Sequence, residues 1–187
     1  DYDPLDAVGT LEAAPFGPVV WDQAPGNLCF DWAAGDEAKC KAAFDHAAHT
    51  AHVEVVQNRI VANSMETRNA IGIVENGKYT LYTSSQGAGQ LRDRVVAVLP
   101  GLTKETLRVV TPDVGGGFGM KGFLYPEQAL VLVAAKLTGR PARWSGERTE
   151  AFLADDAGRD MRTRADIALD KDGKILAVHI KGTANMG

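Results

Sequence analysis

Residues 107–126 have the sequence LRVVTPDVGGGFGMKGFLYP, which predicts a strand, a glycine-rich loop and the start of a helix in succession. Leucine and valine dominate its start and predict a strand over 107–111. A glycine-rich loop follows over 112–122. Pro126 then stands where a helix tolerates proline, because the N–H that proline lacks would be unpaired in the first turn. The expected helix runs to about Leu137 and closes at Gly139, and its apolar residues 129–135 predict burial on every side.

The same pattern occurs once before in the chain. Residues 78–83 are predicted to form a strand, 84–89 a loop, and 90–99 a helix that Pro100 and Gly101 terminate. We expect the two strands to be parallel, so that both loops leave the same carboxyl edge of one sheet. Gln86, in the first loop, would then face the glycine-rich loop of the second unit.

Hairpins and capping signals predict the remaining elements. Asn76 and Gly77 are the strongest short hairpin signal, and Asp36 is a predicted helix N-cap. The fold class is therefore α/β, or α+β, with a mixed sheet, successive strand–loop–helix units and a C-terminal hairpin. The other expected elements are an extended segment over 1–28 with a short strand at Val19–Trp21, a helix over 37–48, a strand from His52, strands over 70–75 and 142–144, a short helix over 147–154, and a hairpin of 161–169 with 175–181.

The composition is that of an ordinary globular protein. The 187 residues are 45% hydrophobic and 24% charged, with 20 basic and 24 acidic residues and a net charge of −4. This balance offers no basic footprint for a phosphate backbone, so no nucleic acid is expected as a partner. No apolar run approaches the roughly 18 residues of a membrane span, and no signal peptide is visible. Cys29 and Cys40 form no C-x-x-C pair, and we expect small buried thiols in a reducing, cytoplasmic compartment.

Residues 115–119 contain four glycines, which a fold does not need for stability, since glycine loses more conformational entropy on folding than any other residue. Such a loop suits a backbone that approaches a ligand closely, and successive bare amides can bind anionic oxygens. The helix that begins downstream adds a positive dipole. With the carboxamide of Gln86, the loop predicts a site for a phosphate, an oxo group or another anion. A tight turn without a ligand is the structural alternative.

A second interpretation uses the same glycines. Gly117, Gly119 and Gly122 match the G-x-G-x-x-G fingerprint of an NAD(P)- or FAD-binding module, between a predicted strand and a predicted helix. However, residues 111–113 intervene where the strand should run directly into the first glycine. The acidic residue that should follow about 20 residues later is also absent. A dinucleotide-binding module is therefore the alternative function.

Other polar groups have structural explanations. Three histidines recur at every third residue over 46–52, but the helix is expected to end between them, so solvent-exposed or capping histidines are favoured over a metal site. Glu66 and Arg68 suggest a local ion pair, and Glu127 suggests a carboxylate that complements a helix dipole. A salt-bridge network is expected among Arg143, Arg148 and Glu150.

Several ordered motifs resemble one known family, over nearly the whole chain. The pairing of TSSQ at 83–86 with PDVGGGFGMK at 112–121 is similar to the molybdenum-binding subunit of the xanthine dehydrogenase family. The motifs resemble in particular the large subunit of aerobic carbon monoxide dehydrogenases and their relatives. The supporting motifs are EAA at 12–14, APGN at 24–27, METR at 65–68, GRP at 139–141, RTE at 148–150 and DGK at 172–174.

The resemblance implies a molybdopterin cofactor with molybdenum, usually in the cytosine dinucleotide form in bacterial members. Such proteins hydroxylate a carbon centre of a small molecule, or oxidise CO, with water as the oxygen source. Electrons leave through an iron–sulfur subunit and an FAD-binding subunit. By position, Gln86 matches the glutamine whose side chain approaches an oxo ligand of molybdenum. Gly116, Gly117, Phe118 and Gly119 match the loop whose backbone packs against the metal centre.

Two departures from the family pattern narrow the substrates and the activity that are expected of this stretch. Purine-oxidising members carry a glutamate after the lysine of the glycine loop, where this chain has Gly122, which disfavours a purine substrate. The family's general base and a second metal-facing loop lie downstream of the matched region, so no catalytic residue and no activity are expected from this stretch alone. The absence of an initial Met suggests a portion of a longer subunit, with an extended segment over 1–28 and part of a molybdopterin-binding domain over 29–187.

Overall fold

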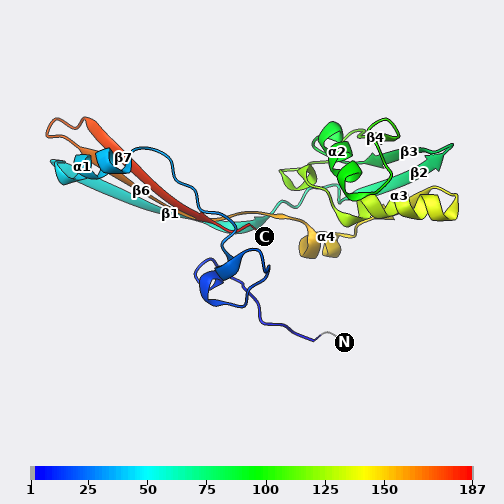
Figure 1. Ribbon diagram of the computed structural model, residues 1–187, viewed down its shortest axis with the longest axis horizontal. Helices are drawn as coiled ribbons and strands as arrows, with labels where there is room; N and C mark the ends of the chain where they lie inside the picture. The colour runs from blue at the N-terminus through cyan, green and yellow to red at the C-terminus, as the bar shows by residue number, and fades with distance from the viewer. Residues whose placement is uncertain (1–2, 187) are drawn as a thin grey trace. The chain divides into compact units, whose positions relative to one another are not determined.

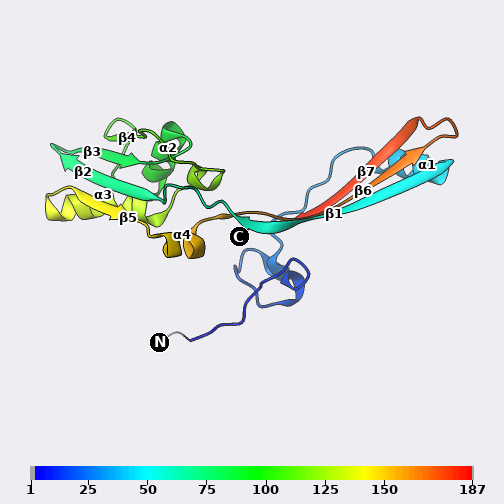
Figure 2. The same cartoon turned by 180° about the vertical axis from the view of Figure 1, so that it is seen from behind.

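The computed structural model of the protein describes residues 3–186 (Figures 1 and 2). These residues divide into two compact units. One unit comprises residues 60–158, and the other is formed by the segments 3–59 and 159–186. The predicted mixture of helices and a mixed sheet is confirmed, and the loops that carry the candidate site all belong to the unit of residues 60–158.

A four-stranded mixed sheet organises the 60–158 unit, in the order β4-β3-β2-β5. Its strands are β2 (Asn69–Glu75), β3 (Lys78–Thr83), β4 (Leu107–Val110) and β5 (Ala142–Ser145). The hairpin of β2 and β3 turns at Asn76 and Gly77, both at positive φ. β3 and β4 are parallel, as expected, whereas β5 pairs antiparallel with β2. The parallel pair places the ends of β3 and β4 at one edge.

Two helices pack on this sheet. α2 (Ala88–Val98) connects β3 to β4, and α3 (Pro126–Thr138) lies mainly against β2. A short helix, α4 (Arg148–Ala154), follows β5. Gly72 permits the close approach of α3, because a Cβ there would lie 2.5 Å from the carbonyl oxygen of Val131. The buried core joins the sheet residues Ala70, Leu81 and Leu107 to the helix residues Leu91, Val95, Val131 and Leu132.

The ends of α3 are as predicted, but its burial is not. Gly139 closes the helix in the left-handed conformation, and its N–H donates to the carbonyl oxygen of Ala135. Burial on every side was expected, yet the side chain of Leu130 is 60% exposed and that of Leu137 is 80% exposed. The sheet covers only one side of the helix, so the apolar residues on the other side have no layer above them among the described residues.

A three-stranded sheet organises the other unit, in the order β1-β6-β7. Its strands are β1 (His49–Val61), β6 (Ala157–Leu169) and β7 (Ile175–Ala184), and the predicted hairpin of β6 and β7 is confirmed. α1 (Glu37–Asp45) packs against β7, and its N-cap is Asp36, whose Oδ1 accepts the N–H of Lys39 at 2.9 Å. This helix is shorter than expected, because Ala48 already donates its N–H to Leu169 in the sheet.

The N-terminal segment differs from its prediction. Residues 19–21 form no strand, and two 3₁₀ turns, η1 (Ala14–Phe16) and η2 (Pro25–Asn27), occupy the segment instead. The side chain of Asn27 explains this, since its Nδ2 donates to the carbonyl oxygens of Ala14 and Pro18 and its Oδ1 accepts the N–H of Val20. These bonds fold the segment on itself. Cys29 is exposed rather than buried, since it lies in irregular chain without a packed layer.

Candidate functional site

The loops that follow β3 and β4 lie side by side. A hydrogen bond of 2.9 Å joins the hydroxyl oxygens of Ser85 and Thr111, the residues that leave the two parallel strands. Ser85 is buried, so this contact holds the starts of the loops together beneath the surface. Because the strands are parallel, residues 26 positions apart in sequence meet at one edge of the sheet.

Gln86 contacts the glycine-rich loop directly, as expected. Its Oε1 accepts the backbone N–H of Gly119 at 2.9 Å. Its side chain also fills the space beside Gly117, where a Cβ would lie 2.6 Å from the same oxygen. Glycine at position 117 therefore gives the amide side chain room to lie flat against the backbone. The bond to Gly119 uses the carboxamide oxygen and leaves the Nε2 group as the outward donor.

The loop presents several donors without partners. Among the described residues, no hydrogen-bond acceptor is found for the backbone N–H groups of Gly116, Gly117 and Phe118, nor for Nε2 of Gln86. Phe118 lies at φ +51°, is 77% exposed, and places its ring 3.0 Å from where a Cβ of Gly116 would be. Non-glycine residues seldom adopt this conformation, and strained residues cluster at binding sites. The donors suit an anionic or oxo ligand.

Glu66 holds one side of this loop, a role that was not predicted from sequence. Its Oε2 accepts the N–H of Gly115 at 2.9 Å and pairs with Nζ of Lys121 at 2.7 Å. Asn69 donates its side-chain amide to the other carboxylate oxygen at 3.0 Å. Partial burial pushes the pKa of Glu66 upward, but the hydrogen bonds from Lys121, Gly115 and Asn69 outweigh it, so this pKa lies below its ordinary value. The expected Glu66–Arg68 pair is therefore wrong.

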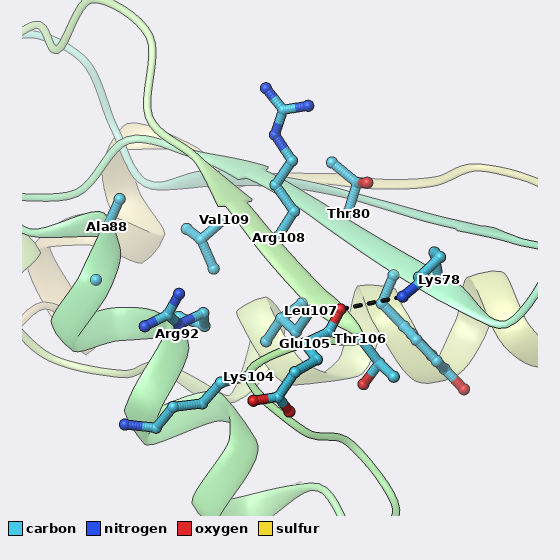
Figure 3. A pocket seen from close by; sticks show the side chains of 12 residues that line it. Lys78, Thr80, Ala88, Arg92, Lys104, Glu105, Thr106, Leu107, Arg108 and Val109 are labelled. Carbon is cyan, nitrogen blue, oxygen red and sulfur yellow. Dashed lines mark hydrogen bonds between the residues drawn. The ribbon is translucent and has the colours of Figure 1, made fainter.

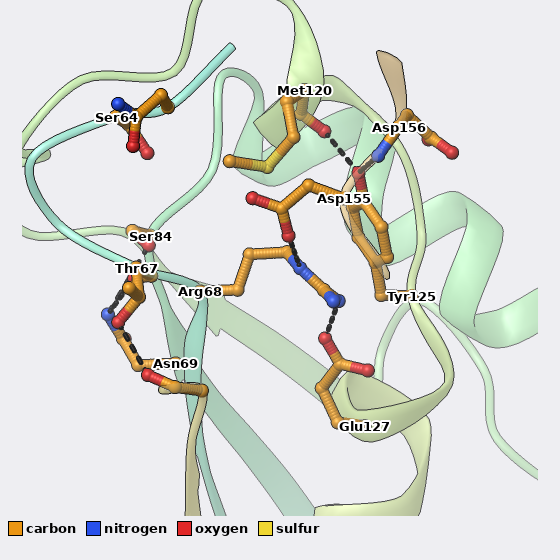
Figure 4. A network of polar contacts seen from close by, with 12 residues as sticks. Ser64, Thr67, Arg68, Asn69, Ser84, Met120, Tyr125, Glu127, Asp155 and Asp156 are labelled. Carbon is orange, nitrogen blue, oxygen red and sulfur yellow. Dashed lines mark hydrogen bonds and ion pairs between the residues drawn. The ribbon is translucent and has the colours of Figure 1, made fainter. Parts of the chain in front are cut away.

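Arg68 instead lies at the centre of a buried polar network (Figure 4). Its guanidinium pairs with Glu127 and, at 2.6 Å, with Asp155, and it stacks 3.7 Å from the ring centroid of Tyr125. Glu127 lies in the first turn of α3, as expected, and binds Arg68 as well. Glu66 lies in a bend before β2, and the packed chain brings Lys121 to its carboxylate, whereas Arg68 meets Glu127 and Asp155.

Tyr125 links this network to the end of the glycine-rich loop. Its hydroxyl donates to the carbonyl oxygen of Met120 at 3.1 Å and accepts the N–H of Asp156 at 3.1 Å, as Figure 4 shows. Burial raises the pKa of Tyr125 to about 12, so the phenol is neutral at physiological pH and remains a donor. The network therefore anchors the segment that leaves the loop toward α3.

Arg148 supports the segment before Glu66. Its guanidinium donates to Oδ1 of Asn63 at 2.8 Å and to the carbonyl oxygens of Ser64 and Met65 at 2.7 and 2.8 Å. The salt-bridge network expected with Arg143 and Glu150 is not found among the described residues, because the guanidinium of Arg148 bonds instead to Asn63 and to two backbone carbonyls. The METR and RTE motifs were the sequence signals that could have located this contact.

No metal site competes with this location. Within residues 3–186, no group of three or more His, Cys, Asp or Glu side chains is arranged to hold a metal ion. His46 caps the end of α1, while the other two histidines of 46–52 lie on β1. The same described range contains no helix that is long and apolar enough to cross a membrane.

A separate basic hollow of about 460 Å³ lies beside the starts of β3 and β4 and the first turn of α2 (Figure 3). Four cationic side chains line it, but most of them are already paired. Arg92 and Lys104 pair with Asp93, and Lys78 donates to the carbonyl oxygen of Glu105. The hollow shares no residue with the glycine-rich loop, so the hydrogen-bond donors of the loop belong to a different site.

The sequence and structure of the chain are similar to those of known proteins. A family model described as "Molybdopterin cofactor-binding domain" matches residues 20–187. The carbon monoxide dehydrogenase large chain of Hydrogenophaga pseudoflava is 31% identical over 199 residues, which cover 99% of this chain and 24% of that protein. The chain thus spans about a quarter of the length of this relative.

Two solved structures share the fold. A Cu,Mo-CO dehydrogenase in its carbon monoxide reduced state matches with a TM-score of 0.85 and 28% identity, over 97% of this chain and 25% of that one. Quinoline 2-oxidoreductase from Pseudomonas putida 86 matches with a TM-score of 0.79 and 30% identity, over 97% of this chain and 23% of that one. Both alignments cover almost all of the chain.

The dinucleotide interpretation gains no support from these similarities or from the geometry. Six residues separate the end of β4 at Val110 from Gly117. Gly122 lies in the short 3₁₀ turn η3 (Met120–Gly122) rather than in a helix that starts at the glycines, and α3 begins only at Pro126. The fingerprint requires the strand, the glycine turn and the helix to be continuous, so that the helix dipole reaches the pyrophosphate.

Proposed function

The chain belongs to the molybdopterin cofactor-binding domain family, and on that premise we propose that it forms one wall of the cofactor site of a molybdenum-dependent oxidoreductase. The observation that carries the proposal is the contact of Gln86 with Gly119, which gathers a carboxamide and bare backbone amides around one space. Cofactor-binding roles are assigned to Gln86, Gly116, Gly117, Phe118 and Gly119.

The donors of these residues fit such a cofactor. Three backbone N–H groups and one carboxamide N–H₂ group have no protein acceptor among the described residues, and oxo and phosphate oxygens accept such bonds. At Gly117, the space that a Cβ would need is taken by Gln86, so the backbone stays bare and open to close approach. A site built for a cation would instead present oxygen or sulfur ligands.

The contribution of this chain is binding and orientation. A bound molybdenum cofactor would supply the two-electron oxidation of the substrate, with water as the source of the oxygen. Nε2 of Gln86 is held in one orientation, because its Oε1 is already bound to Gly119. The loop amides are held by Glu66 at one end and by Lys121 at the other. No side chain of this stretch is proposed to act as an acid or a base.

The finer features of the whole protein follow from the family resemblance. We propose the cytosine dinucleotide form of the cofactor and a small-molecule substrate of the kind that carbon monoxide dehydrogenase-like enzymes oxidise. Gly122, which follows Lys121, supports a substrate other than a purine. The two electrons would pass to an iron–sulfur subunit and an FAD-binding subunit. The two unpaired cysteines, Cys29 and Cys40, support a cytoplasmic location.

The proposed organisation assigns residues 29–187 to part of the molybdopterin-binding domain. The family match over 20–187 supports this assignment. The preceding residues 3–28 form irregular chain and 3₁₀ turns, which supports a separate N-terminal segment.

Metal and cofactor analysis of the protein purified from its native host tests the proposal. We expect about one molybdenum and one pterin per chain, with flavin and iron–sulfur clusters in the same preparation. A protein that carries neither molybdenum nor pterin contradicts the proposed function. Gln86→Ala should change the electron paramagnetic resonance signal of the reduced metal. The matched control is Gln90→Ala, an exposed glutamine in α2, which should leave the signal unchanged.

A further inference from the structure

We propose that Glu66 is a positioning residue, which with Lys121 forms a tether that sets where the glycine-rich loop lies relative to Gln86. The inference rests on the proposed function, because the loop and Gln86 are its cofactor-binding groups. Among the described residues, the carboxylate of Glu66 bonds to Asn69, Gly115 and Lys121 and forms no hydrogen bond with Gln86.

At the first end of the loop, Glu66 binds Gly115 twice. The carboxylate accepts the N–H of Gly115 at 2.9 Å, and the N–H of Glu66 donates to the carbonyl oxygen of Gly115 at 3.0 Å. The two residues touch so closely that a Cβ on Gly115 would lie 2.5 Å from the Cβ of Glu66. Ser64 in turn donates its hydroxyl to the carbonyl oxygen of Glu66 at 2.7 Å. These contacts couple the position of Gly115, at the start of the loop, to the position of Glu66.

At the other end, the same carboxylate holds Lys121. Its Oε2 lies 2.7 Å from Nζ, and only 1% of the lysine side chain is exposed. The carbonyl oxygen of Lys121 accepts the backbone N–H of Gln86 at 3.0 Å. The contacts thus form a closed ring, from Glu66 through Lys121 and Gln86 to Gly119 in the loop. One carboxylate fixes both ends of the loop and, through Lys121, the residue that faces it.

The charge of Glu66 is needed for this arrangement. Glu66 is the only carboxylate that pairs with Lys121 among the described residues. A buried ammonium that loses its counter-ion is strongly disfavoured, so Lys121 would turn toward solvent and carry its backbone with it. The bond from Gln86 to the carbonyl oxygen of Lys121 would then be lost. Neutralising Glu66 should therefore displace the glycine-rich loop and Gln86 together, although neither the loop nor Gln86 carries the substitution.

Amide hydrogen exchange measured by mass spectrometry on the purified protein tests the tether directly. We expect Glu66→Gln and Lys121→Met each to speed exchange over residues 113–121 about tenfold, the change for one lost charged hydrogen bond. Exchange over α3 should stay unchanged. The double variant should exchange no faster than either single one, because both substitutions break one interaction. Lys121→Met removes the buried charge rather than stranding it, so this variant keeps the fold.

The matched control is Asp93→Asn, which breaks the carboxylate–lysine pair of Asp93 with Lys104 at 2.8 Å on the surface. It should change neither exchange nor molybdenum content, whereas the tether variants should lower the molybdenum content severalfold. Unchanged exchange over 113–121 in Glu66→Gln overturns the inference. So does an equal rise over α3, since Glu66 would then support the fold as a whole. Wild-type protein without molybdenum overturns the proposed function, while the exchange measurement judges the tether separately.

Discussion

Oε1 of Gln86 lies 2.9 Å from the backbone nitrogen of Gly119, and this hydrogen bond joins loops that are 33 residues apart in sequence. It makes the two loops one structural unit with a defined outward face. The carboxamide cannot turn over without losing the bond, because Nε2 would then face the N–H of Gly119, donor against donor. The glycine-rich loop, through the N–H of Gly119, therefore sets the orientation of the Gln86 carboxamide.

Substitution of Gly117 should affect the site far more than stability. In Gly117→Ala, the new Cβ would lie 2.6 Å from Oε1 of Gln86, and the flexible end of that side chain can move away. We expect a loss of less than about 1 kcal/mol in the free energy of unfolding, together with a severalfold drop in molybdenum content. Gly122→Ala is the matched control, since nothing lies within 4 Å of its Cβ position. Equal molybdenum content in both variants would contradict the role of the Gln86 contact.

Substitution of Gly72 should do the opposite and destabilise the fold. In Gly72→Ala, the Cβ would lie 2.5 Å from the carbonyl oxygen of Val131, in the rigid backbone of α3. We expect a loss of about 1–3 kcal/mol, measured by urea unfolding. Gly89→Ala, in the first turn of α2, meets no atom within 4 Å and should be neutral or stabilising by up to about 1 kcal/mol. A Gly72→Ala variant as stable as wild type would show that α3 packs differently.

Removal of Arg68 should leave two carboxylates without their cation. Glu127 and Asp155 both pair with its buried guanidinium, so we expect Arg68→Met to cost about 3–5 kcal/mol in urea unfolding. Arg92→Met removes a partly exposed arginine paired with Asp93 and should cost less than about 1 kcal/mol. Similar losses for the two variants would mean that the buried network contributes no more than a surface ion pair.

The lowered pKa of Glu66 predicts a particular dependence of stability on pH. A carboxyl group whose pKa falls on folding stabilises the native state above its unfolded pKa, here near the ordinary value of 4.5. That contribution disappears as the pH falls through the lower folded pKa. The difference in urea midpoint between wild type and Glu66→Gln should therefore be constant near neutral pH and shrink below about pH 4.5. A difference that grows on acidification would contradict the ion pair with Lys121.

Local signals predicted the elements that local interactions create. The cap at Asp36, the turn at Asn76 and Gly77, and the closure at Gly139 each depend on a few neighbouring residues, and each was predicted correctly. The strand at Val19–Trp21 was wrong, because the side chain of Asn27 folds that segment on itself. A single amide that reaches several residues back in the chain leaves no periodic pattern in the sequence.

Sequence alone was enough to predict the parallel strand–loop–helix units, the facing of Gln86 and the glycine-rich loop, and the family resemblance. Each depends on short motifs and on the rule that parallel strands end at one edge. The partners of the buried charges, in contrast, depend on the tertiary structure. Glu66 pairs with Lys121, 55 residues away, rather than with Arg68, two residues away. Ion pairs between loops depend on which side chains the packed backbone brings within about 4 Å in a shielded environment, and sequence distance does not encode that.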